Sequence, residues 1–236
     1  MNKVIITGAA NGIGKAIVKR LHKQGAMIFA CDIDVSGLAK LREELRDIKT
    51  YAFDIANEPA VNEFFEEIRE IKCNWLVNNA GIYLGQDLLT YQSGEIERVF
   101  RINCFGAVYC TRFFSTNLIE GGHKGAIVNI SSVSGQEGSS DAIYGMTKAA
   151  ILGLTKSCAQ NFAPLIRVNA IAPGLVNTDM ARKIPSKRLI DYGINDFSDI
   201  AIQPEDVAGA VCFLLSTEAA HITGSTLDIN CGHYLR

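Results

Sequence analysis

Short apolar runs alternate along the whole chain with segments in which apolar residues recur every three to four positions. The short runs are rich in β-branched residues and predict buried strands at 3–7, 26–34, 49–55, 74–81, 125–132, 166–174 and 225–232. The periodic segments predict helices at 12–25, 37–47, 59–70, 93–122, 142–162 and 204–216. A weaker helical pattern covers 178–193.

Strands that alternate with helices from end to end indicate an α/β protein with a parallel sheet. We therefore predict a doubly wound Rossmann fold of about seven strands with helices on both faces. Neither a linker nor a repeat divides the sequence, so residues 1–236 are expected to form one domain. In such a sheet, ligands bind at the carboxyl ends of the strands, where the strand order reverses.

Composition and charge exclude several classes of partner. The hydrophobic content of 48% suits a sheet covered on both faces, and the net charge is only −2. No block of Lys and Arg suggests nucleic acid, and no apolar run approaches the roughly 18 residues of a membrane span. The first strand begins so early that no signal peptide is expected. Seven scattered cysteines without a C-x-x-C pair predict reduced thiols, a cytoplasmic location and no metal site.

A glycine-rich segment, "TGAANGIG", lies between the first predicted strand and the first helix. Its glycines permit a tight turn, close approach of the backbone to a pyrophosphate, and close packing of helix on strand. The helix that follows directs free N–H groups and a positive dipole end at the phosphates. We expect this loop to bind a dinucleotide through Gly8, Asn11, Gly12, Ile13 and Gly14.

Asp32 ends the second predicted strand, 18 residues after Gly14. A carboxylate at about this offset accepts hydrogen bonds from the ribose hydroxyls of the adenosine and repels a 2′-phosphate. No Lys or Arg follows closely, so the sequence predicts NAD rather than NADP, with Asp32 and Ile33 at the ribose. The alternatives are that Asp34 makes this contact, or that neither acid does.

Tyr144 and Lys148 lie four residues apart in the predicted helix 142–162 and therefore project from one face, with Cβ atoms about 5–6 Å apart. A tyrosine ordinarily keeps its proton at pH 7 because its pKa is about 10. A nearby ammonium, with a cationic cofactor ring, lowers that value. The pair predicts a phenol that acts as an acid and a base.

Together these segments resemble the short-chain dehydrogenase/reductase family over essentially the whole chain. The further segments that match its motifs are "FDIAN", "NNAG", "RINCFG", "ISSVSG", "IAPGLVNTDM" and "ITGSTLDINCG". By this resemblance, the remaining cofactor contacts are Asp54, Ile55, Asn79, Ala80, Gly81, Tyr144, Lys148, Pro173, Gly174, Val176 and Thr178. Residues 1–90 would then form mainly the cofactor-binding half, and 91–236 the catalytic and substrate half.

The resemblance also implies roles in an alcohol–ketone conversion. Tyr144 would be the general acid and base, and Lys148 would lower its pKa and hold the nicotinamide ribose. A serine hydroxyl would stabilise charge on the substrate oxygen, and Asn103 would hold a water that links Lys148 to solvent. No metal is implied.

Two serines compete for the serine role. Ser131 lies thirteen residues before Tyr144, the family's usual count, whereas Ser132 occupies the usual place in the strand motif "iSSvxG". Successive strand residues point to opposite faces, so only one can serve, and we favour Ser132. Cys231 replaces the first glycine of a common "GG" ending, at a position expected to accept a small apolar side chain. No functional meaning is attached to Gln160 and Asn161, which stand where many relatives have an acid.

The substrate is less well specified. Residues 179–203 are expected to cover it and are mixed in character, with apolar side chains at Met180, Ile184, Leu189, Ile190 and Phe197. Gln136 and Glu137 are expected to contact a polar substrate or solvent. The leading interpretation is an NAD-dependent alcohol dehydrogenase. The alternatives are an NADPH-dependent 3-oxoacyl-[acyl-carrier-protein] reductase and a silent dinucleotide-binding protein. The resemblance also implies a homotetramer, or a dimer, paired through 95–119 and the Tyr144 helix.

Overall fold

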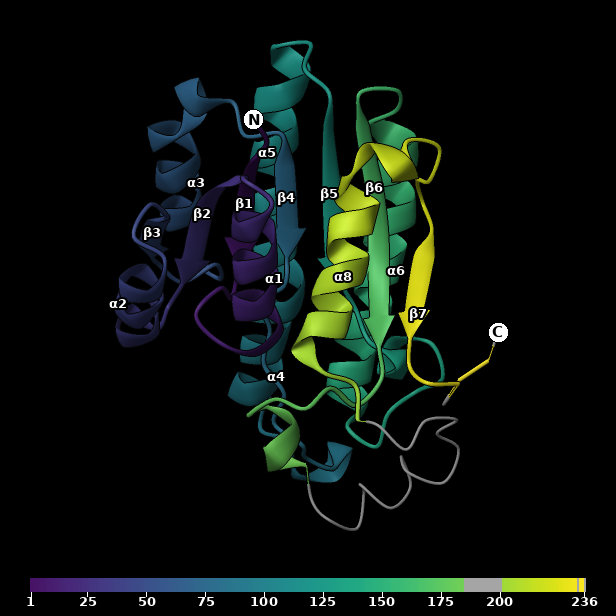
Figure 1. Cartoon of the computed structure of the whole chain (residues 1–236). Helices are drawn as coiled ribbons and strands as arrows, with labels where there is room; N and C mark the ends of the chain where they lie inside the picture. Colours follow the sequence, from purple (N-terminus) through teal and green to yellow (C-terminus); the bar gives the residue numbers. More distant parts are fainter. Residues whose placement is uncertain (185–200, 233, 236) are drawn as a thin grey trace.

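A computed structural model describes residues 1–184, 201–232 and 234–235 and has one parallel sheet at its centre (Figure 1). Its seven strands are β1 (Lys3–Thr7), β2 (Met27–Asp32), β3 (Lys49–Ala52), β4 (Trp75–Asn78), β5 (Gly125–Ile130), β6 (Ile166–Pro173) and β7 (Thr226–Ile229). They lie in the order β3-β2-β1-β4-β5-β6-β7, and every pairing is parallel. The predicted α/β sheet is confirmed.

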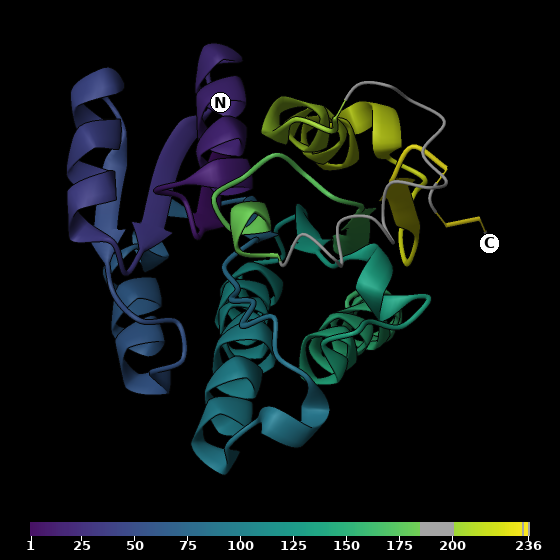
Figure 2. The ribbon, with the colours of Figure 1, turned by 90° about the horizontal axis from the view of Figure 1, so that it is seen from below.

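Helices cover both faces of the sheet, as the view in Figure 2 shows. They are α1 (Gly12–Lys23), α2 (Val35–Glu44), α3 (Glu58–Glu67), α4 (Ser93–Phe100), α5 (Gly106–Glu120), α6 (Ala142–Asn161) and α8 (Pro204–Leu215). One apolar cluster joins the sheet to α1, α2 and α8, and a second joins the opposite face to α3, α5 and α6. Alternate residues of β1 enter different clusters because successive strand side chains point to opposite faces: Val4 and Ile6 enter the first, and Ile5 the second.

The strand order reverses between β1 and β4, because β2 and β3 lie on one side of this pair and β5, β6 and β7 on the other. The chain leaves β1 and β4 toward opposite sides, so the loops at their carboxyl ends separate and leave a crevice between them. The glycine-rich loop after β1 and the "NNAG" loop after β4 meet at this point, since the Asn79 side chain donates to the carbonyl oxygens of Thr7 and Gly8.

The single long helix predicted over 93–122 is wrong. A π-helical segment, η3 (Arg101–Phe105), separates α4 from α5. Asn103 lies in this segment and its buried side chain bonds to the backbone of Ile82 and to Thr147. These hydrogen bonds stabilise the wider turn of the π-helical segment. The repeat of apolar residues in the helices on either side is unchanged.

Several other predicted elements are shorter than the sequence indicated, among them the third strand and the described part of the helix over 178–193. The third strand ends at Ala52 rather than residue 55, because the Asp54 carboxylate accepts from the Ala56 backbone and starts a turn. In 178–193, the described part has only a short 3-10 turn, η5 (Ala181–Lys183). Residues 185–200, including Leu189, Ile190 and Phe197, lie outside the described residues.

The seven cysteines are free thiols, and six of them are buried. Within the described ranges, no helix is long and apolar enough to cross a membrane. The expected division of the chain near residue 90 into two functional halves stays a prediction.

Candidate active site

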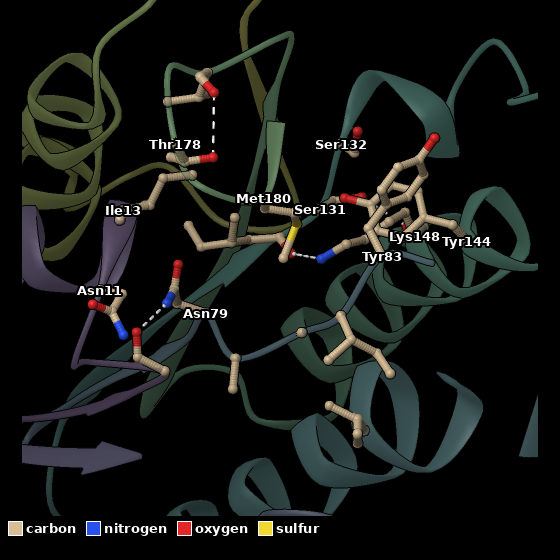
Figure 3. A pocket seen from close by; sticks show the side chains of 18 of the residues that line it. Asn11, Ile13, Asn79, Tyr83, Ser131, Ser132, Tyr144, Lys148, Thr178 and Met180 are labelled. Carbon is tan, nitrogen blue, oxygen red and sulfur yellow. Dashed lines mark hydrogen bonds between the residues drawn. The ribbon is translucent and has the colours of Figure 1, made fainter. Parts of the chain in front are cut away.

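A cavity of about 730 Å³ opens at the carboxyl ends of the strands. The predicted site residues that line it are Gly8, Asn11, Gly12, Ile13, Asp32, Ile33, Asp54, Ile55, Asn79, Ala80, Gly81, Ser132, Tyr144, Lys148, Pro173, Gly174, Val176 and Thr178. Figure 3 shows two groups of labelled side chains, with Asn11 and Ile13 at one end and Ser132, Tyr144 and Lys148 at the other. Gly14 and Asn103 lie behind the cavity wall, where they position its lining.

The glycine-rich loop forms one end of the cavity. Gly8 has a φ of +65°, a conformation that favours glycine. A Cβ on Gly14 would lie 1.9 Å from the Gly8 carbonyl oxygen, so the close contact of α1 with the loop requires glycine there. Among the described residues, no side chain caps the first turn of α1. Its N–H groups are therefore available to an anion such as a pyrophosphate.

Asp32 is fixed at the mouth of this end. One carboxylate oxygen accepts from the Ala10 backbone N–H and the other from that of Asp34, both at 2.9 Å. Asp34 instead caps α2 by accepting from the Gly37 backbone at 3.0 Å, and its other oxygen accepts from the Asn11 amide at 3.1 Å. The hydrogen bond from Gly37, followed by those from Ser36 and Asn11, lowers the pKa of Asp34. Of the two acids, Asp32 is the one that lines the cavity.

Tyr144 and Lys148 lie in the first two turns of α6, at the other end of the cavity. The Lys148 ammonium is 5.6 Å from the centre of the Tyr144 ring, and it donates to the Ile130 carbonyl oxygen at 2.9 Å. Lys148 is 6% exposed, and its burial lowers its pKa from 10.5 to about 8. Most molecules therefore still have a positive charge beside the phenol at neutral pH.

The two serines differ in their hydrogen bonds. The Ser131 hydroxyl donates to the backbone carbonyl oxygen of Lys148 at 2.7 Å and so ties the end of β5 to α6. The Ser132 hydroxyl oxygen accepts from the Ser134 backbone at 3.2 Å, which leaves the hydroxyl hydrogen for a ligand. Both serines border the cavity.

Asn103 uses its side chain to hold the "NNAG" loop. Its Oδ1 accepts from the Ile82 N–H at 2.8 Å, and its Nδ2 donates to the Ile82 carbonyl oxygen at 2.9 Å and to Thr147 at 3.1 Å. A Cβ on Gly81 would lie 3.2 Å from Asn103 Oδ1 and 3.6 Å from Lys148 Nζ. Glycine at position 81 therefore leaves room beside the lysine ammonium.

Several lining residues were not anticipated from the sequence. Tyr83 and Tyr144 meet edge to face, with ring centroids 5.0 Å apart and planes at 81°. Tyr83 follows "NNAG" by two residues, in the loop that borders the cavity. The sequence does not indicate which side chains of this loop point into the cavity. Arg98 and Arg101 line the cavity from α4 and η3, and Arg101 pairs with Glu97 at 2.9 Å.

The residues expected around the substrate have different outcomes. Met180 and Ile184 line the cavity, as expected for part of a substrate cover. Gln136 instead donates from its amide to the Asp228 carboxylate of β7 at 2.8 Å, and Glu137 is exposed.

Comparison with known proteins gives consistent matches over nearly the full chain. A family model described as "Enoyl-(Acyl carrier protein) reductase" matches residues 8–233. The (3R)-3-hydroxyacyl-CoA dehydrogenase of Canis lupus familiaris is 31% identical, over 98% of this chain and 95% of that protein. The meso-2,3-butanediol dehydrogenase of Serratia marcescens is 30% identical, over 97% and 93%.

A solved structure is equally similar. The 3-ketoacyl-(acyl-carrier-protein) reductase from Brucella melitensis complexed with NADH superposes with a TM-score of 0.90 at 30% identity, covering 99% of this chain and 98% of that one.

Proposed function

This chain belongs to the short-chain dehydrogenase/reductase family of oxidoreductases, which interconvert secondary alcohols and ketones, and we propose that it does so with NAD(H) and with Tyr144 as general acid and base. The observation that supports this most directly is the position of the Lys148 ammonium, 5.6 Å from the centre of the Tyr144 ring and in the same cavity as the glycine-rich loop. The proposed pair and the proposed dinucleotide site thus open into one space.

The cavity suits a dinucleotide at its glycine-rich end. The uncapped N–H groups of α1 would bind the pyrophosphate, the Asp32 carboxylate the adenosine ribose, and Asp54 and Ile55 the adenine. Lys148 would hold the second ribose, and the nicotinamide supplies hydride chemistry when bound. The remaining cofactor residues of the lining would complete these contacts.

At the other end, the chain's own groups handle the proton and the substrate oxygen. In ketone reduction, Tyr144 donates its phenolic proton to the substrate oxygen, and in alcohol oxidation the phenolate takes the proton back. The Ser132 hydroxyl donates a hydrogen bond to the same oxygen and stabilises its developing charge. The side chain of Asn103 already makes hydrogen bonds to Ile82 and Thr147. The water that links Lys148 to solvent would therefore be held by the backbone of Asn103, in the π-helical segment.

Asp32 is the basis for the proposed preference for NAD over NADP. Its carboxylate is held at the cavity mouth by two backbone N–H groups, where it can accept from ribose hydroxyls and repel a 2′-phosphate. A relative is known in complex with NADH, which supports binding of the reduced form without deciding between the two cofactors.

Fluorescence titration of the purified protein with NADH and with NADPH tests this cofactor assignment. Tight NADH and weak NADPH binding are expected. A preference for NADPH would contradict the ribose contact of Asp32 and would favour the acyl-thioester alternative.

A 3-oxoacyl thioester reductase remains the second candidate because Arg98 and Arg101 place two guanidinium groups in the cavity wall, although Glu97 in the same wall pairs with Arg101. They would attract the phosphates of coenzyme A or of an acyl-carrier protein. Comparing kcat/KM for 2,3-butanediol with that for acetoacetyl-CoA distinguishes the two.

We also propose a homo-oligomer in which α5 and α6 face a second copy. Phe105 (47% exposed), Val108 (38%) and Met146 (56%) are large apolar side chains on η3, α5 and α6 that would be covered by such pairing. Light scattering coupled to size exclusion is expected to give a tetramer or dimer, and a monomer would contradict the proposal. A cytoplasmic location is proposed from the buried reduced thiols.

A further inference from the structure

Asp141 is fully buried, with 0% exposure, and lies three residues before Tyr144 as the N-cap of α6. Its Oδ1 accepts from the Tyr144 backbone N–H at 3.0 Å. Its Oδ2 accepts from the Gly85 backbone N–H at 3.0 Å, and the Tyr91 hydroxyl lies 2.9 Å from both oxygens. A carboxylate removed from water in this way is stable only when hydrogen bonds replace the lost hydration.

Helix capping alone does not explain a carboxylate at this position. One side-chain oxygen suffices to cap a helix, and serine caps about as well as aspartate. The bonds from Gly85 and Tyr91 come from a different segment, the loop between β4 and α4, which lies 50 to 56 residues earlier in the chain. Two oxygens are needed because Asp141 joins this loop to the helix that carries the Tyr144–Lys148 pair.

The phenol of Tyr91 is held as a hydrogen-bond donor. Its burial and then its hydrogen bond to Asp141 raise its pKa far above the usual value. Tyr91 therefore keeps its proton and its bond to Asp141 throughout the pH range in which a protein of this kind is assayed.

The same loop places Tyr83 against Tyr144. The two rings meet edge to face at 5.0 Å, and both line the cavity. Gly85, which donates to Asp141, has a φ of +70°, and a Cβ there would lie 3.1 Å from the Tyr83 ring. The bond from Gly85 to Asp141 thus fixes the loop backbone two residues from Tyr83.

We propose that Asp141 is a positioning residue: it clamps the loop 83–91 to the first turn of α6 and so sets the geometry of Tyr83 and Tyr144 around the substrate. The clamp acts on the substrate end of the cavity, away from the glycine-rich loop, and it controls turnover far more than dinucleotide affinity. This inference rests on the function proposed above for Tyr144.

Asp141→Ser separates the clamp from the cap, because serine retains an oxygen for the Tyr144 N–H but is too short to reach both Gly85 and Tyr91. Steady-state turnover of 2,3-butanediol and acetoacetyl-CoA is expected to fall at least about tenfold, since small displacements of catalytic groups are this costly. NADH affinity, measured by fluorescence, is expected to stay within twofold. Asp87→Ser is the matched control, because Asp87 caps a short turn in the same loop from an exposed position.

Tyr91→Phe removes one arm of the clamp and is expected to reduce turnover less than Asp141→Ser. The double variant is expected to be no worse than Asp141→Ser alone, because both changes break the same contact. Additive losses would overturn the proposal, as would an Asp141→Ser protein that keeps full kcat or loses NADH affinity in parallel.

Hydrogen exchange gives a readout independent of activity. Asp141→Ser is expected to raise exchange in residues 83–91 and to leave α1 unchanged. Unchanged exchange in 83–91 would contradict the clamp even if the wild-type protein turned over neither substrate, whereas failure of the proposed function alone would leave this result intact.

Discussion

The ammonium of Lys148 lies 5.6 Å from the centre of the Tyr144 ring and is held there by the carbonyl oxygen of Ile130, at 2.9 Å. This carbonyl belongs to the last residue of β5, so the sheet itself fixes the position of the charge. Burial then lowers the pKa of Lys148 to about 8. The chain thus retains a partly desolvated ammonium beside a phenol, which has a measurable consequence for stability.

Replacing Lys148 by Met should stabilise the fold below pH 8. The folded pKa of about 8 is lower than the value of 10.5 in the unfolded chain, so the unfolded state binds more protons between these pH values. The contribution of Lys148 to wild-type stability therefore rises as the pH increases from about 8 to about 10.5, and it is lowest, by roughly 3 kcal/mol, below this window. Burial raises the pKa values of six cysteines, and this lowers the stability of both proteins alike at high pH. The test is therefore the difference between the two proteins in urea unfolding: Lys148→Met should be more stable than the wild type at pH 7, and this advantage should shrink at pH 10.

Ser132→Ala should reduce turnover by roughly 100-fold or more, the usual loss for one donor to a developing oxyanion. Ser131→Ala should leave turnover nearly unchanged and lower stability by about 1 kcal/mol, because it removes the hydrogen bond to the Lys148 carbonyl oxygen. Steady-state kinetics and urea unfolding of Ser132→Ala and Ser131→Ala check these two predictions. The opposite pattern would assign the role to Ser131.

Asp32→Asn should weaken NADH binding about tenfold and improve NADPH binding, because it removes the negative charge but keeps one oxygen for a backbone N–H. Asp34→Asn is the matched control, since asparagine also caps helices and Asp34 is the N-cap of α2. Titration with both dinucleotides measures the effect. An equal change in both variants would argue against a specific role of Asp32.

Cys231→Gly should raise stability by about 1 kcal/mol. Cys231 has a φ of +52°, a left-handed conformation that is unfavourable for any residue with a Cβ. The side chain packs beside the core, as expected for a small apolar group, but the backbone strain was not anticipated. Thermal unfolding of the two proteins tests this, and a less stable glycine variant would show that thiol packing outweighs the strain.

The fold was predictable because alternating strand and helix patterns admit few arrangements. The glycines follow from local turn chemistry, and Asp32 follows from its place at the end of the second strand. The π-helical segment at Asn103 could not be predicted from the sequence, because one added residue per turn barely changes the apolar periodicity around it. Asp141 could be recognised as a helix cap from its place before 142–162. Its hydrogen-bond partners Gly85 and Tyr91 could not be recognised, since only the folded sheet brings the loop between β4 and α4 to α6.

The central claim is that Tyr144 transfers the proton in a reaction that uses a bound dinucleotide. Tyr144→Phe removes the hydroxyl and little else, so turnover of whichever of 2,3-butanediol and acetoacetyl-CoA the wild type accepts should fall by on the order of 1,000-fold. Fluorescence titration should give an NADH affinity within a few-fold of wild type. Substantial turnover by this variant, with NADH bound, would contradict the account.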